Sequence, residues 1–136
     1  MRYNLFISHS WAYSDQYDRL VSLLDNSGID YRNYSIPMYD PIDYAYNSYQ
    51  LKEAIYNQMK PASCVLILAG VYSTYSEWIN IELGQAVSLG KPIIAIEPWG
   101  SQRTSATVKT MADYIVGWNT NSIVNAIKQS QRLQFI

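Results

Sequence analysis

Hydrophobic and polar positions alternate between two periodicities along the chain, which predicts a regular succession of strands and helices. Short apolar runs or alternating stretches, the pattern of buried and half-buried strands, occur at 3–8, 29–34, 63–69, 92–97 and, most weakly, 113–118. The run at 63–69 is continuously apolar rather than alternating. Continuous runs are typical of parallel strands covered on both faces of a sheet.

Between these strands, apolar residues recur at helical spacing. Ser14 can cap a first helix that ends at Gly28, and a later helix ends at Gly90, because glycine readily takes the left-handed conformation of a helix end. Residues 35–48 carry two prolines and no periodicity, which predicts a loop, and 98–112 predict a loop or a short helix. The expected helical stripes are Tyr17, Leu20, Val21 and Leu24; Leu51, Ala54, Ile55 and Met59; and Ile123, Val124 and Ile127.

Strands that alternate with helices predict one α/β domain over residues 1–136, with five parallel strands in an open, doubly wound sheet. Such sheets bind ligands beyond the carboxyl ends of their strands, at the switch point beside the first strand. The segments expected at that edge are 8–11, 33–35, 69–76 and 97–99.

Charge and cysteine content narrow the function. The 10 basic and 11 acidic residues nearly balance, which argues against a nucleic-acid binder. No apolar run reaches the roughly 18 residues of a membrane span, and the apolar run at the N-terminus is too short for a signal peptide. A single cysteine, Cys64, fits the reducing cytoplasm. With His9 as the only histidine, we expect no metal site.

Tyrosine is the unusual component, with 13 residues, six of which fall between Tyr31 and Tyr49. A tyrosine ring is apolar with a polar tip, which suits a half-wet cleft or a contact surface. Simple packing beneath a long loop is the alternative.

One position breaks the pattern. The helix that contains SEWINIELGQA has an apolar arc that includes Leu83, Ala86 and Val87, and Glu82 falls inside this arc, one turn after Trp78. A buried carboxylate costs several kcal/mol unless it is paired. Either Glu82 reaches water or a basic partner at the edge of the sheet, or it serves chemistry or sugar-hydroxyl binding at the mouth of a cleft.

Familiar nucleotide motifs are absent. The sequence contains neither GxGxxG after its first strand nor GxxxxGK[ST], which excludes a Rossmann dinucleotide site and a P-loop. No GxSxG elbow accompanies His9, so a serine hydrolase is disfavoured. His9 ends the first strand at the switch point, where a role near phosphate or ribose competes with a structural one.

Three segments together resemble a known family. NLFISHSW at 4–11, NYSIP at 33–37 and the WxxxE element at 78–82 are similar to TIR domains, and most similar to the bacterial Thoeris antiphage-defence TIR subunits, ThsB. The resemblance covers essentially the whole chain. It implies a flavodoxin-like three-layer sandwich. In enzymatic members, it also implies NAD⁺ as the substrate rather than as a bound cofactor.

The resemblance also implies roles for residues. Glu82 would be catalytic, with Ser76 and Trp78 in support, and the loop at 35–48 would join copies of the domain into a homo-oligomer. The product, a hydrolysed, cyclised or conjugated ADP-ribose, would diffuse to a separate effector protein. The implied substrate-binding residues are Phe6, Ser8, His9, Trp11, Asn33, Tyr34 and Tyr39.

Two other functions remain open on the residues. The same surfaces could serve only protein contacts, in a TIR module without catalysis. Alternatively, IELGQAVSLGKPI at 81–93 resembles a segment of nucleoside deoxyribosyltransferases, which also carry a glutamate on a helix. A buried Glu82 favours an enzyme, because a scaffold does not need it.

Overall fold

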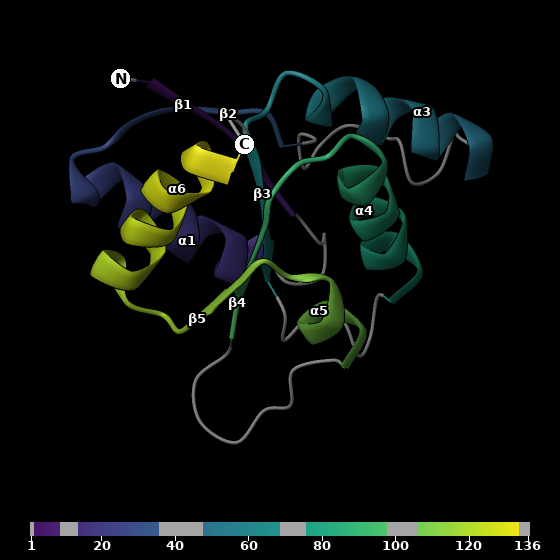
Figure 1. Cartoon of the computed structure of the whole chain (residues 1–136). Coiled ribbons are helices and arrows are strands. Elements are labelled where there is room, and N and C mark those ends of the chain that lie inside the picture. Colours follow the sequence, from purple (N-terminus) through teal and green to yellow (C-terminus); the bar gives the residue numbers. More distant parts are fainter. Residues whose placement is uncertain (1, 9–13, 36–47, 69–75, 98–105, 134–136) are drawn as a thin grey trace.

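The computed structural model describes residues 2–8, 14–35, 48–68, 76–97 and 106–133 (Figure 1). The five strands lie within two residues of their predicted bounds, and the first helix begins at the predicted Ser14. The segment at 98–112, predicted as a loop or a short helix, contains a helix in its described part. In chain order, the elements are β1 Arg2–Ile7, α1 Ser14–Ser27, β2 Asp30–Asn33, α3 Ser48–Met59, β3 Cys64–Leu68, α4 Ser76–Ser88, β4 Ile93–Ile96, α5 Ala106–Met111, β5 Tyr114–Val116 and α6 Thr120–Leu133.

The five strands form one parallel sheet in the order β2-β1-β3-β4-β5. The order reverses beside β1, so the switch point lies between β1 and β3. Helices α1 and α6 cover one face, and α3, α4 and α5 cover the other (Figure 1). These three layers confirm the predicted α/β, flavodoxin-like architecture.

Each face of the sheet carries its own apolar core, because successive strand residues point to opposite sides. On β1, Phe6 packs with α3 and α4, whereas Leu5 and Ile7 pack with α1 and α6. All residues of β3 and β4 are buried, which confirms the prediction from their continuous apolar runs. The edge strands β2 and β5 are half-buried or exposed.

Both predicted glycine helix ends are present. Gly28 follows α1 with φ of 87°, and Gly90 follows α4 with φ of 67°. A side chain at either position would be strained in this left-handed conformation. Within the described ranges, none of the helices has both the length and the apolar character that crossing a membrane requires.

Candidate functional site

Glu82 lies on α4 above the carboxyl end of β1. Its side chain is 1% exposed, so it does not reach water. The hydroxyl of Ser8, which is 2% exposed, donates a hydrogen bond of 2.6 Å to Glu82 Oε1. Ser8 directly follows β1, and its N–H donates to the carbonyl of Leu66 on β3 at 2.8 Å. The buried carboxylate is therefore tied to the two strands that flank the switch point.

The buried arc of α4 is narrower on one side than the helical wheel predicts. Leu83 and Ala86 are fully buried, but Val87 is 56% exposed, so its predicted place in the arc is wrong. On the other side, Ile81 is partly buried against the same core. The buried face of α4 therefore extends toward Ile81 and does not include Val87. Glu82 thus sits well inside the buried face, and not at its margin.

A second group of polar contacts fixes the ends of β1 and β2. The amide of Asn33 donates from Nδ2 to the Tyr17 hydroxyl at 2.7 Å. Asn33 Oδ1 accepts hydrogen bonds from the N–H of Ser35, at 2.9 Å, and from its hydroxyl. The Ser35 hydroxyl in turn accepts from the N–H of Ile7 at 3.3 Å. This chain of contacts ends one residue from Ser8.

The structure brings three of the predicted site residues together at this place. Ser8 and Glu82 are bonded to each other, and Phe6 packs in the core beside them. Phe6 is 1% exposed and packs in the core with α3 and α4, so its ring presents no face to solvent. The side-chain amide of Asn33 is hydrogen-bonded to Tyr17 and Ser35. The backbone N–H of Tyr34 donates to the carbonyl of Leu5 at 2.8 Å.

The other predicted residues have no described side chain. Ser76 and Trp78 lie in the first turn of α4. His9, Trp11 and Tyr39 lie outside the described residues, as does most of the loop at 35–48. All the substrate-binding and supporting roles stay predictions.

Sequence reasoning missed Tyr17 as part of this site, and it placed Ser35 at the expected edge of the sheet without predicting its hydrogen bonds. Tyr17 had been assigned only to the apolar stripe of its helix. The signal for Ser35 was present, since an asparagine two residues before a serine at a strand end is typical of a side chain that bonds to the backbone two residues on.

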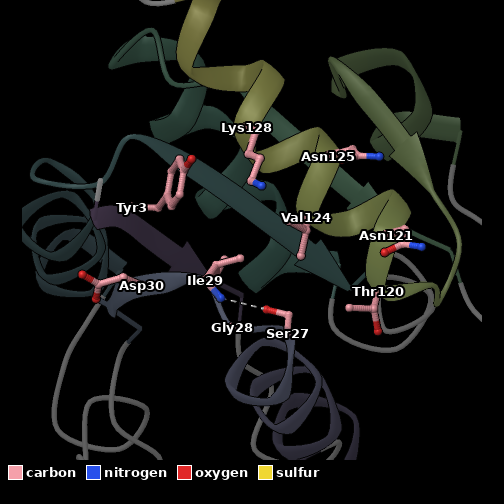
Figure 2. A pocket seen from close by; sticks show the side chains of 10 residues that line it. All are labelled: Tyr3, Ser27, Gly28, Ile29, Asp30, Thr120, Asn121, Val124, Asn125 and Lys128. Carbon is pink, nitrogen blue, oxygen red and sulfur yellow. Dashed lines mark hydrogen bonds between the residues drawn. The ribbon is translucent and has the colours of Figure 1, made fainter.

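A groove of about 500 Å³ lies elsewhere on the molecule (Figure 2). It runs between the start of β1 and β2, the turn after α1, and α6. Figure 2 shows Lys128 and Val124 of α6 pointing toward Ile29, whose N–H is bonded to the Ser27 hydroxyl at 3.4 Å. Its lining belongs to the face of α1 and α6, so it is separate from Glu82.

Among the described residues, no group of three or more His, Cys, Asp or Glu could hold a metal ion.

Comparison with solved structures supports the fold. A structure of the Clostridium botulinum CMP N-glycosidase BcmB has a TM-score of 0.56 and 16% identity, over 93% of this chain and 98% of that one. A 3-dehydroquinate dehydratase-like protein from Bifidobacterium longum has a TM-score of 0.49 and 9% identity, over 100% and 99% of the two chains. The first likeness shows the fold alone, and the second is too low to carry an argument.

Comparison with families and with curated proteins gives one match. No curated protein matches the chain. The family described as "Thoeris protein ThsB, TIR-like domain" matches residues 6–103, which is more than half of the chain. The resemblance drawn from NLFISHSW and the WxxxE element is thereby confirmed, and the chain belongs to the family of Thoeris ThsB TIR-like domains.

Proposed function

We propose that this domain cleaves the bond between nicotinamide and ribose in NAD⁺, with Glu82 as the catalytic carboxylate. One observation carries the proposal: Glu82 is buried on α4 and bonded to Ser8 at the switch point of the sheet. A carboxylate in this place costs free energy that an apolar side chain would not. It also lies at the edge where parallel α/β sheets bind their ligands.

The chemistry requires little more than a carboxylate. As the C1′–N bond breaks, its electron pair stays with the nicotinamide nitrogen, and the pyridinium leaves as a neutral molecule. The ribose gains oxocarbenium character, which Glu82 stabilises through its charge or by holding the ribose hydroxyls. A nucleophile then bonds to C1′: water gives ADP-ribose, whereas a group of the same molecule or of another one gives a cyclic or conjugated product.

Ser8 has a supporting part in this scheme. Its hydroxyl donates to Oε1 of Glu82 and its backbone is held by Leu66, so the carboxylate oxygen is fixed relative to β1 and β3. Fixed charges stabilise a transition state better than mobile ones, because they need no reorganisation during the reaction.

The similar structures and the family support the same class of reaction. BcmB is described as a CMP N-glycosidase, which acts on the same kind of bond, between a sugar and a nitrogen base. In keeping with the family, we propose that the product diffuses through the cytoplasm to a separate effector. The loop at 35–48 would join copies of the domain. NAD⁺ is the substrate here, and the reaction needs no metal.

The test is an assay with purified protein and NAD⁺, across a protein concentration series and with lysate of phage-infected cells as a trigger. Mass spectrometry follows nicotinamide and the ADP-ribose species. Glu82→Gln keeps the shape but removes the charge, so nicotinamide release should fall by at least about 100-fold. Glu53→Gln, on the exposed face of α3, is the matched control and should retain activity. Release that is equal in Glu82→Gln would refute the catalytic role.

A second candidate is N-glycosidic cleavage of a nucleoside or nucleoside monophosphate. The likeness to BcmB favours it, together with the deoxyribosyltransferase-like segment at 81–93. The same assay includes CMP and deoxynucleosides beside NAD⁺. Base release from these substrates alone, lost in Glu82→Gln, would select this candidate. No release from any substrate, with no binding of NAD⁺, would select a module that serves protein contacts.

A further inference from the structure

The end of β1 is held on both sides, but by different means. On the side of β3, the N–H of Ser8 donates to the carbonyl of Leu66. On the side of β2, the last backbone hydrogen bond of β1 is made by Leu5, whose carbonyl accepts from the N–H of Tyr34. The N–H of Ile7 then meets a side chain, because the Ser35 hydroxyl takes the place of a backbone carbonyl.

Asn33 sets the orientation of that hydroxyl. The Ser35 O–H donates to Asn33 Oδ1, so an oxygen lone pair is left for the N–H of Ile7. Asn33 is itself held, since its Nδ2 donates to the Tyr17 hydroxyl on α1. Each donor in the chain therefore has one acceptor, and the last donor is the backbone of β1.

We propose that Ser35, oriented by Asn33, is a positioning residue for the bonded pair of Ser8 and Glu82. This inference rests on the proposed function for its effect on activity, but not for its effect on structure. Ile7 and Ser8 are consecutive, so loosening the N–H of Ile7 frees the last residue of β1 to move. A displacement of about 1 Å at a catalytic group is enough to cost activity.

The structural test is amide hydrogen exchange of Ser35→Ala, measured residue by residue by NMR. The amide of Ile7 should exchange about tenfold faster, and the carbon-13 signal of the Glu82 carboxyl should shift. Ser35→Thr keeps the hydroxyl and should restore both readings. Asn33→Ala should reproduce the Ser35→Ala result, because the serine hydroxyl is then no longer oriented.

Ser63→Ala is the matched control. Ser63 also bonds its hydroxyl to the backbone of β1, at the Asn4 carbonyl 3.0 Å away, but on the far side of Leu5 from the site. It should leave the Ile7 amide and the Glu82 signal unchanged. Unchanged readings in Ser35→Ala, or equal changes in Ser63→Ala, would overturn the proposal.

The activity test is separate. Ser35→Ala should lower kcat for nicotinamide release by about tenfold with little change in KM, because the contact acts on the carboxylate and not on the substrate. A fall in substrate affinity alone would overturn the positioning role. If the unaltered protein releases no nicotinamide, the proposed function fails, but the exchange experiment still decides whether Ser35 positions Ser8 and Glu82.

Discussion

Helices α4 and α6 cover opposite faces of the sheet, and each buries a polar side chain in an otherwise apolar stripe. On α6, Ser130 is fully buried and donates to the carbonyl of Ile127, three residues earlier, at 2.6 Å. On α4, Glu82 accepts from Ser8, which is 74 residues away, also at 2.6 Å. The two bonds have equal lengths but very different origins.

The difference distinguishes a polar side chain that only fills space in the core from one that is held in place by a distant part of the fold. Ser130 satisfies its hydroxyl on the preceding turn of its own helix, and its other side-chain contacts, with Gln131 and with the neutral Cys64 thiol, join uncharged groups. A carboxylate can only accept, and the backbone N–H groups of its own helix are already used, so it needs a donor from elsewhere. The burial of Glu82 on α4 therefore indicates a function, whereas the burial of Ser130 on α6 is explained by packing.

The largest expected contrast is in catalysis. Glu82→Gln should lower nicotinamide release by at least about 100-fold, because the negative charge facing the ribose is lost. Ser130→Ala on α6 should change release by less than about twofold, since its contacts lie on the opposite face of the sheet from α4. Comparable losses in both variants would show that activity follows general stability. Urea unfolding of each variant serves as the control.

The contrast should also appear in stability. Ser8→Ala leaves a buried carboxylate without one of its donors, and should lower the free energy of unfolding by about 2 kcal/mol. Ser130→Ala should cost less than about 1 kcal/mol, because alanine favours the helix and the partners left behind are uncharged. Urea denaturation of both variants measures the difference. Equal losses in the free energy of unfolding would contradict the proposed difference between Glu82 on α4 and Ser130 on α6.

A smaller contrast concerns titratable groups on the side of α1 and α6. Burial raises the pKa of the Cys64 thiol to about 12, so it stays neutral in the folded protein. A disulfide reagent at pH 8 should react with Cys64 only as fast as the chain unfolds, because the thiolate is the nucleophile. Immediate reaction of the native protein would show that this core opens locally.

The smallest expected effect is at Tyr31. Burial, and then the bond of 2.7 Å to Asp25, raises the pKa of Tyr31 above its ordinary value of 10.0. The phenol therefore adds stability that is fully present below pH 10 and is lost as the pH rises through the raised pKa. Tyr31→Phe should cost about 0.5 kcal/mol at pH 7, since the bond is exposed. The free energy of unfolding of Tyr31→Phe should also fall less steeply above pH 10 than that of the unaltered protein. Urea unfolding curves over a range of pH would measure this.

The fold followed from the sequence because the inner strands β3 and β4 are continuous apolar runs and two helix ends are glycines. Even the place of Glu82 on a buried face was readable from helical spacing. The hydrogen bond between Glu82 and Ser8 could not be predicted, since nothing in the sequence indicates that two residues 74 positions apart are in contact. The exposure of Val87 also escaped prediction, because helical spacing gives the centre of an apolar arc more reliably than its edges.

The sequence distance between Ser8 and Glu82 has a consequence for synthesis. Strand β1 leaves the ribosome well before its neighbour β3 and the carboxylate on α4. Contacts between distant segments form late in folding, because long stretches of chain must first be ordered. A growing or truncated chain that ends before α4 has the serine without the glutamate, so any activity that depends on Glu82 requires a chain that extends through α4.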